Sequence, residues 1–127
     1  MAGKKPIRIF ISYDFDNDRV LKSFLRGQCR HPKRRGTVLD YSLKEASPQK
    51  SWQNKAREKI KRSDKVIVLA GPKTRRATGV KKEIEMARQE GKPIAQLIAR
   101  KKVTCPRVPG AGRRYKWNDT NLAKLLK

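Results

Sequence analysis

The sequence predicts a three-layer α/β/α sandwich, in which a mainly parallel sheet of four or five strands carries helices on both faces. Short apolar segments alternate with amphipathic segments along the chain, as in parallel βαβ units. The apolar segments are almost continuously hydrophobic, which is typical of strands buried on both faces. The chain of 127 residues is 36% hydrophobic, enough to bury one core. We therefore expect a single domain over residues 1–127, flavodoxin-like in outline.

Two strands and two helices are predicted in the first half of the chain. Residues 7–12 (IRIFIS) are β-branched and aromatic and predict a buried strand. Asp16 or Asn17 can cap the helix that follows. The predicted apolar face of that helix contains four residues: Val20, Leu21, Phe24 and Leu25. Residues 37–41 predict a short strand, and residues 52–60, apolar at every fourth position, predict the next helix.

The second half of the chain continues the alternation. Residues 65–70 (KVIVLA) form the clearest apolar run and predict a strand. The next helix is expected to begin near Thr78 or Gly79 and to end at Gly91, where Gly-Lys-Pro is an exit signal. Residues 93–98 predict another strand. A Pro- and Gly-rich stretch then leads to a terminal helix over residues 118–126.

The charge of the chain is strongly positive. It has 34 Lys and Arg against 11 Asp and Glu, a formal net charge of +23. The basic residues fall in tracts: Arg30 with residues 33–35, Lys73 with residues 75–76, residues 81–82, residues 100–102 and residues 113–114. Such a surface attracts nucleic acid or other polyanions without reading sequence. The alternative is a solvated surface with no dedicated partner, because no zinc-finger spacing, RNP-like motif or GXXG loop is present.

The two cysteines and the apolar runs indicate where the protein is located. Cys29 and Cys105 have no CxxC motif and no His at metal spacing, so we expect no metal site and reduced thiols. No apolar run approaches the roughly 18 residues needed to cross a membrane. The first residues, MAGKKP, are followed by a short strand-like stretch without a cleavage-site pattern, so we expect no secretory signal. We therefore expect a cytoplasmic protein without a membrane partner.

Polar residues gather at the ends of three predicted strands. Ligands bind in open α/β sheets at the carboxyl ends of the strands. The first strand is followed by YDFDND, which holds three of the eleven acidic residues of this basic chain. This clustering brings no gain in solubility or stability and therefore points to a site. The residues expected at that edge are Ser12, Tyr13, Asp14, Phe15 and Asp16 after the first strand, Asp40, Tyr41 and Ser42 after the second, and Gly71, Pro72, Lys73 and Thr74 after the third.

The helix that follows Gly71 contains two glutamates with different predicted environments. At ~100° per residue, Val80, Ile84 and Ala87 define its buried face. Glu83 lies roughly 70° from the centre of that face, whereas Glu85 lies about 130° away, on the solvent side. A partly desolvated carboxylate near the strand ends is typical of general acids and electrostatic stabilisers. The alternative for Glu83 is a surface carboxylate favoured by the helix dipole.

Two chemistries fit this edge of the sheet from the residues alone. The first is nucleotide binding, in which Gly71 permits close backbone approach and hydroxyl and carboxylate groups hold ribose, although no GxGxxG or P-loop is present. The second is phosphoryl transfer to an aspartate, as in response-regulator receivers, with Asp14 and Asp16 as Mg²⁺ ligands. Ala70 and Gly71 stand where the phosphoacceptor aspartate of a receiver is required, which counts against the second chemistry.

Four segments of the sequence resemble TIR domains. They are residues 10–18 (FISYDFDND), residues 40–42 (DYS), residues 62–71 (RSDKVIVLAG) and residues 80–87 (VKKEIEMA). The match is closer to the bacterial and archaeal TIR-like family that includes the TIR proteins of Thoeris anti-phage systems. The resemblance covers roughly residues 7–98. Nucleoside deoxyribosyltransferase-like folds share the architecture and a helix glutamate and are a neighbouring possibility.

The resemblance implies chemistry on NAD⁺, as a substrate and not as a cofactor. Catalytic TIR domains cleave the bond between nicotinamide and ribose, and the Thoeris type makes a cyclic or rearranged ADP-ribose signal. The catalytic glutamate of the family aligns with Glu83, which would stabilise an oxocarbenium-like transition state. The resemblance also implies that a pocket for the nucleotide is formed by a set of residues at the strand ends: Ser12, Asp14, Phe15, Tyr41, Ser42 and Gly71. A second copy of the chain is an expected partner, through TIR-like surfaces.

The sequence departs from the TIR pattern at the start of this helix. Gly79 stands where the pattern has Trp, and Thr78 where it has Ser. This departure motivates a second hypothesis, a non-catalytic TIR-like module that binds nucleotides or partner TIR surfaces. The basic tracts motivate a third hypothesis, an effector associated with nucleic acid.

Overall fold

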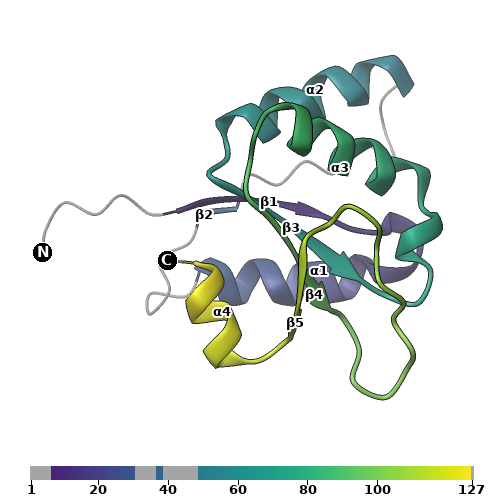
Figure 1. The fold of residues 1–127 in the computed structure, drawn as a ribbon, viewed down its shortest axis with the longest axis vertical. Helices are drawn as coiled ribbons and strands as arrows, with labels where there is room; N and C mark the ends of the chain where they lie inside the picture. Colours follow the sequence, from purple (N-terminus) through teal and green to yellow (C-terminus); the bar gives the residue numbers. More distant parts are fainter. Residues whose placement is uncertain (1–6, 31–36, 39–48, 127) are drawn as a thin grey trace, which may run out of the picture.

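A five-stranded parallel sheet forms the centre of the molecule (Figure 1). The computed structural model describes residues 7–30, 37–38 and 49–126. The strands are β1 (Arg8–Ser12), β2 (Thr37–Val38), β3 (Lys65–Ala70), β4 (Ile94–Ile98) and β5 (Arg113–Lys116). Their order in the sheet is β2-β1-β3-β4-β5, and each neighbouring pair is parallel. The predicted α/β class with a parallel sheet is confirmed.

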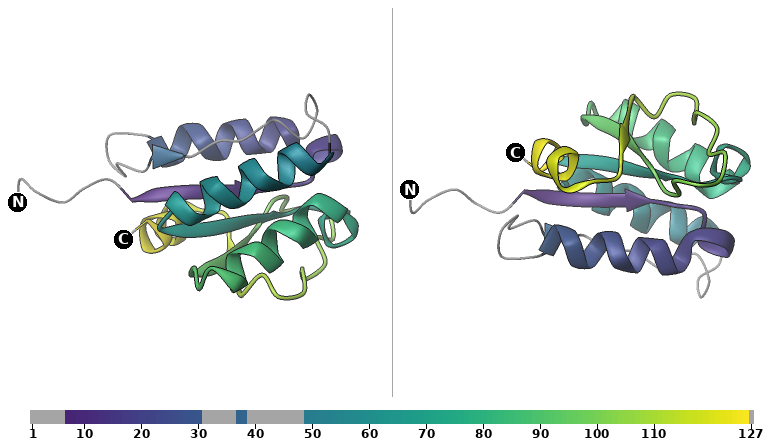
Figure 2. Two further views of the ribbon diagram at one scale, coloured as in Figure 1. Left: turned by 90° about the horizontal axis from the view of Figure 1, so that it is seen from above. Right: turned by 90° about the horizontal axis from the view of Figure 1, so that it is seen from below.

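Helices cover both faces of this sheet. They are α1 (Phe15–Arg30), α2 (Gln49–Arg62), α3 (Thr78–Gln89) and α4 (Asp119–Leu125), with a short 3₁₀ helix at Thr74–Arg76. The helices α2 and α3 lie on one face, and α1 and α4 lie on the other (Figure 1). Figure 2 looks onto the sheet from above, the side of α2 and α3, and from below, the side of α1 and α4. No helix among the described residues is long and apolar enough to cross a bilayer.

The alternation of side chains along β1 divides the core into layers. Ile9 and Ile11 pack with α1 and α4, whereas Phe10 packs with α2 and α3. The whole of Val66–Ala70 in β3 is inaccessible to solvent, which accounts for its continuous apolar run. Ser12 follows Phe10 on the α2 and α3 side. The alternation therefore sends the Ser12 hydroxyl toward α3.

The predicted apolar face of α1 is wrong for two of its four residues. Val20 is 68% exposed and Phe24 is 61% exposed. The buried face consists of Asp18, Lys22, Leu25 and Cys29, at i, i+4, i+7 and i+11. The backbone at Asp18 is non-helical, with φ −120° and ψ 18°. Its buried side chain sets the rotation of the helix, so that Val20 and Phe24 face outward.

The ends of the other elements fall near their predicted places, with one addition. Helix α3 ends before Gly91, which adopts φ +66°. Helix α4 begins after Asn118, whose side chain accepts a hydrogen bond from the amide of Asn121 at 2.8 Å. The strand β5 was not predicted as an element. Only Thr37–Val38 of the predicted strand 37–41 is described, and its last three residues lie outside the described part of the chain.

Candidate functional site

A buried hydrogen bond joins the end of β1 to α3 at the carboxyl edge of the sheet. The hydroxyl of Ser12 donates to Oε1 of Glu83 at 2.7 Å. Ser12 is 0% exposed and Glu83 is 1% exposed. A carboxylate withdrawn from water needs such a partner, because an unsatisfied buried acceptor is costly. The structure therefore brings together two of the predicted site residues that are 71 positions apart.

The packing of α3 explains why Glu83 and not Glu85 reaches this edge. The buried residues of the helix are Val80, Glu83, Ile84, Met86 and Ala87. Glu83 therefore lies beside the apolar stripe, while Glu85 is exposed. The side chain of Glu85 accepts a hydrogen bond from Gln89 at 3.4 Å on the surface. The predicted difference in burial between the two glutamates is confirmed.

The acidic loop after β1 is folded by its own backbone and side chains. The carbonyl of Asp14 accepts hydrogen bonds from the amides of Asn17 at 3.3 Å and Asp18 at 2.8 Å, in the first turn of α1. The Asp14 carboxylate accepts a hydrogen bond from the side-chain amide of Asn17 at 2.6 Å. Asp14 is 6% exposed. The Asp14 carboxylate therefore helps to stabilise the first turn of α1.

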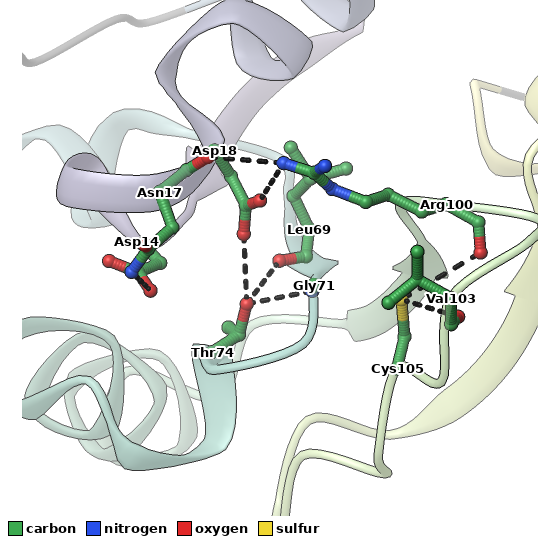
Figure 3. Close-up of polar contacts among 9 residues, drawn as sticks. All are labelled: Asp14, Asn17, Asp18, Leu69, Gly71, Thr74, Arg100, Val103 and Cys105. Atoms are coloured by element: carbon green, nitrogen blue, oxygen red, sulfur yellow. Dashed lines mark hydrogen bonds and ion pairs between the residues drawn. The ribbon is translucent and has the colours of Figure 1, made fainter.

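Asp18 connects three segments at the same edge of the sheet (Figure 3). Its carboxyl group is fully buried. Oδ2 lies 3.2 Å from Oγ1 of Thr74, after β3, and Oδ1 lies 3.5 Å from Nη2 of Arg100, after β4. Arg100 also donates to the carbonyl of Asn17 at 3.3 Å. We call Asp18, Gly71, Thr74 and Arg100 the Asp18 cluster.

The hydroxyl of Thr74 is the centre of this cluster. It accepts a hydrogen bond from the amide of Gly71 at 2.7 Å. It also lies within hydrogen-bond distance of two acceptors, the carbonyl of Leu69 at 3.1 Å and the Asp18 carboxyl. One hydroxyl proton cannot serve both acceptors if Asp18 is ionised. A proton on Asp18 would supply the second hydrogen bond.

The surroundings of Asp18 also favour its protonated form. Burial, followed by the nearby charge of Asp14, raises the pKa of Asp18 above its ordinary value of 3.8. The hydrogen bond from Thr74 and the charge of Arg100 act in the opposite direction and only partly offset the burial. Oδ1 of Asp18 accepts no hydrogen bond from the described residues, which leaves the ionised form incompletely solvated.

Gly71 is explained by this cluster. An ideal Cβ at Gly71 would lie 2.1 Å from Oδ2 of Asp18. The space beside its Cα is thus filled by a carboxyl group of the chain itself. The hypothesis that Gly71 was selected for close approach of a nucleotide is not needed to account for the glycine, and its place in a substrate site stays a prediction.

The other predicted site residues are described in part or not at all. Phe15 begins α1, but its side chain lies outside the described part. Asp40, Tyr41 and Ser42 lie outside the described residues altogether. Among the described residues, no group of three or more His, Cys, Asp or Glu could hold a metal ion. The contribution of Phe15, Asp40, Tyr41 and Ser42 to a substrate site stays a prediction.

Sequence reasoning missed the role of three residues at this edge: Asp18, Thr74 and Arg100. One signal was available for Asp18, since Asp18, Lys22, Leu25 and Cys29 share a helical face. The sequence predicts Thr74 at this edge, because it follows the third strand, but no local pattern marks its contact with Asp18. No local pattern marks Arg100. Their partners are distant in the chain and become neighbours only in the folded sheet.

A comparison with solved structures places the fold, whereas a comparison with curated proteins found no match. Among solved structures, the chain is similar to a 2-desoxiribosyltransferase from Leishmania mexicana, with a TM-score of 0.59 and 19% sequence identity. The match covers 72% of this chain and 64% of that enzyme, so the chain spans less than two thirds of the enzyme's length. At this identity the likeness concerns the fold.

A comparison with protein families identifies the family of this chain. The sequence model of the TIR-like domain of the Thoeris protein ThsB matches residues 10–103. That range contains the last three residues of β1, the whole of α3 and the buried Ser12–Glu83 pair. It covers well over half of the chain. The protein belongs to the TIR-like domain family of the Thoeris protein ThsB.

Proposed function

We propose that this protein is a NAD⁺-consuming enzyme of the TIR type, which cleaves the bond between nicotinamide and ribose and produces a cyclic or linear ADP-ribose signal in anti-phage defence. The observation that carries the proposal is the buried hydrogen bond between Ser12 and Glu83. It places a carboxylate of restricted orientation at the edge of the sheet where parallel α/β folds bind ligands. Membership of the ThsB TIR-like family supports the same reaction class.

The reaction needs stabilisation of positive charge. When the glycosidic C–N bond breaks, nicotinamide leaves with the bonding electrons and the ribose C1′ becomes electron-deficient. A carboxylate stabilises this oxocarbenium-like state more strongly in a dry site than in water. Glu83 would supply that charge and orient the ribose hydroxyls, and Ser12 would hold the carboxylate. Water, or a nucleophilic atom of the ADP-ribose itself, then bonds to C1′ and gives the linear or the cyclic product.

The structural neighbour gives weaker support. Its name describes transfer of a 2-deoxyribosyl group, a reaction at the same sugar carbon. The fold that it shares with this chain is therefore compatible with chemistry at a glycosidic bond. In the proposed site, Asp14 and the predicted strand-end residues Phe15, Asp40, Tyr41 and Ser42 contact the nucleotide. NAD⁺ is the substrate, and no cofactor is needed.

A non-catalytic TIR-like module is the second candidate function. Gly79, the second residue of α3, is half-buried and supplies no ring where the TIR pattern has Trp. The start of α3 lies one turn from Glu83, so a wall of the pocket would be missing on that side. In this alternative the protein binds a nucleotide or a partner TIR surface without turnover.

Product analysis distinguishes the two candidates. Purified protein is incubated with NAD⁺, and nicotinamide and ADP-ribose species are quantified by mass spectrometry. The same products are measured in phage-challenged cells that express the protein. Glu83→Gln keeps an acceptor oxygen for Ser12 but loses the charge. We expect it to lower the rate of nicotinamide release by about 100-fold or more.

The matched control is Glu85→Gln on the exposed side of the same helix. It removes the same charge and is expected to change the rate less than about twofold. Thermal unfolding of each variant establishes that it is folded. Full turnover by a folded Glu83→Gln protein would refute the assignment of Glu83. If the wild-type protein leaves NAD⁺ intact in both settings, the non-catalytic candidate replaces the enzyme.

A further inference from the structure

A second pocket lies at the carboxyl ends of β4 and β5. Its volume is about 470 Å³, within the range of about 300–1,000 Å³ that is typical of small-molecule sites. Neither Ser12 nor Glu83 lines it. Its wall includes four cationic side chains and two apolar ones: Arg100, Lys101, Arg114, Lys116, Val103 and Trp117. We call it the β4–β5 pocket.

The sheet brings two separate basic tracts together in this pocket. The strands β4 and β5 are parallel, and Ile98 is paired with Lys116. The segments that follow both strands therefore leave the sheet at the same edge. Arg114 and Lys116 are two positions apart in β5 and lie on the same face. Lys101, from the segment after β4, then meets them across the strand ends.

The positive charge of the pocket is not fully neutralised by the described residues. Arg100 is already engaged by the chain, because its Nη2 lies 3.5 Å from Oδ1 of the buried Asp18 carboxyl group. Lys101, Arg114 and Lys116 make no ion pair with any described residue. No carboxylate among the described residues lines the pocket, although an adjoining pocket adds the side chain of Asp119. Three cations held together without an anion favour a negatively charged ligand.

Arg114 is already held in place by the loop that closes the pocket. Its Nη2 donates to the carbonyl of Cys105 at 2.5 Å. Its Nε is buried and has no hydrogen-bond partner among the described residues. A guanidinium group has five N–H donors, so this single bond leaves others for an anion. The group is thus oriented before any ligand arrives.

Trp117 gives the pocket a flat apolar wall. Its indole N–H donates to Oε1 of Gln28 in α1 at 2.6 Å, which fixes the orientation of the ring. The ring is half-buried against the core on the α1 side. Val103 is 48% exposed nearby in the segment after β4. An oriented indole beside cations is a surface on which a planar ring can stack while an attached anion is bound.

We propose that the β4–β5 pocket binds a small nucleotide of the mono- or diphosphate class, with its phosphates on Lys101, Arg114 and Lys116 and its base on Trp117. This inference does not depend on NAD⁺ cleavage, because the pocket shares neither Ser12 nor Glu83. A concave pocket of this volume favours a single nucleotide. A nucleic acid strand would instead engage cations along an extended groove.

Calorimetric titration of the full chain with ADP tests the proposal. We expect saturable binding that falls at least about tenfold in affinity in Lys101→Gln/Lys116→Gln, because two charge-assisted contacts are lost. Both lysines are exposed, so this variant is expected to fold. The matched control is Lys61→Gln/Lys124→Gln, which removes two exposed lysines outside the pocket and is expected to change the affinity less than about twofold.

Further arms identify the site and the ligand. Glu83→Gln is expected to bind ADP like the wild type, whereas Trp117→Phe binds it more weakly. Inorganic pyrophosphate and adenosine are each expected to bind more weakly than ADP. The proposal is overturned by absence of ADP binding at millimolar concentration. It is also overturned by pyrophosphate binding as tightly as ADP, or by loss of ADP binding in Glu83→Gln alone.

A single-stranded RNA ten-mer is the last arm. If both double-lysine variants weaken binding of the RNA and of ADP equally, the recognition is general surface electrostatics and the pocket is not a nucleotide site. Selective loss of ADP binding in the Lys101→Gln/Lys116→Gln protein supports the pocket. Circular dichroism and thermal unfolding accompany each variant.

Discussion

The carboxyl group of Asp18 occupies the space that any side chain at Gly71 would need. Oδ2 of Asp18 would lie 2.1 Å from an ideal Cβ at Gly71, and the whole carboxyl group lies within 2.8 Å of it. The two residues belong to α1 and to the turn after β3. Their contact joins the acidic loop to the segment that begins α3, the helix that carries Glu83. The glycine is therefore required by close packing, because its φ is not among the positive values found at Gly91, Gly110 and Gly112.

Replacement of Gly71 by alanine is expected to destabilise the protein by about 2 kcal/mol, since a methyl group fits only if the buried carboxyl group of Asp18 moves away from Thr74 and Arg100. Urea unfolding monitored by circular dichroism measures the change. The control is Gly27→Ala in α1, where an added Cβ meets nothing within 4 Å. It is expected to stabilise the helix by about 0.5–1 kcal/mol.

Combination with a change at Asp18 tests the cause of that loss. The double variant Gly71→Ala/Asp18→Ala is expected to be more stable than Gly71→Ala alone, because removal of the carboxyl group makes room for the methyl group. Additive destabilisation by the two changes would show that the glycine serves another purpose.

The stability contributed by Asp18 is expected to decrease as pH rises. Burial raises its pKa in the folded state, so the folded protein binds more protons than the unfolded chain between pH 3.8 and the raised value. The free energy of unfolding of the wild type, relative to Asp18→Asn, should therefore fall across that interval and be highest below it. Urea unfolding at a series of pH values from about 3 to about 8, which covers the protonated and the ionised forms of Asp18, measures the difference.

Asp64 provides a control in which the pKa is lowered in the folded state, so the dependence of stability on pH has the opposite sign. The backbone N–H of Arg8 donates to its carboxylate at 2.8 Å and, with the Arg8 side chain, holds the pKa of Asp64 below 3.8. The advantage of the wild type over Asp64→Asn should be present above pH 3.8 and disappear as the pH falls through the lowered value. If the Asp18 difference follows the same direction as the Asp64 difference, the assignment of a raised pKa to Asp18 is wrong.

Gln96→Leu is expected to lower the free energy of unfolding by about 2–4 kcal/mol. The buried amide of Gln96 donates to the carbonyls of Val108 at 3.1 Å and Gly112 at 2.8 Å. It also accepts from the amide of Val108 at 2.9 Å. Leucine has a similar volume but removes the hydrogen bonds of the Val108 amide and the Gly112 carbonyl, whereas the Val108 carbonyl keeps that from the amide of Ala111 at 3.2 Å. Gln53→Leu at a half-buried position of α2 is the control, expected within about 0.5 kcal/mol of the wild type.

The position of the Gln96 side chain also links this prediction to the β4–β5 pocket. Val108 and Gly112 lie in the segment that carries Cys105, the acceptor for Arg114. A folded Gln96→Leu protein should therefore bind ADP more weakly than the wild type, as measured by calorimetry. Unchanged stability in this variant would mean that the segment does not depend on Gln96.

Much of the fold follows from local patterns in the sequence. The run KVIVLA predicts β3 because both faces of the strand are buried, and the spacing in α3 separates Glu83 from Glu85. The strand β5 could not be found in this way. Its sequence, RRYK, is mostly charged, and its residues are exposed or half-buried. Its strand conformation comes from pairing with β4 at the edge of the sheet, which no local pattern records.

The rotation of α1 shows a second limit. Val20, Leu21, Phe24 and Leu25 form a plausible apolar face, yet the polar side chains of Asp18 and Lys22 are buried instead of Val20 and Phe24. Asp18 is drawn inward by Thr74 and Arg100, and Lys22 lies over the ring of Tyr13 at 5.5 Å from its centroid. Hydrophobic periodicity records neither contacts between residues distant in sequence nor contacts made by polar side chains, so it could not predict this rotation of α1.

The sequence by itself determined the parallel α/β class, the order of most elements and the choice of Glu83 as the carboxylate at the strand ends, because these depend on continuous apolar runs and on the helical period of 3.6 residues. Only the tertiary structure decided that Ser12 hydrogen-bonds Glu83, that Asp18 fills the space at Gly71 and that two basic tracts surround one pocket. Each of these relationships joins residues from different elements at the carboxyl edge of the sheet. Parallel strands bring such residues together through long crossovers, and their contacts exist only when the sheet has formed.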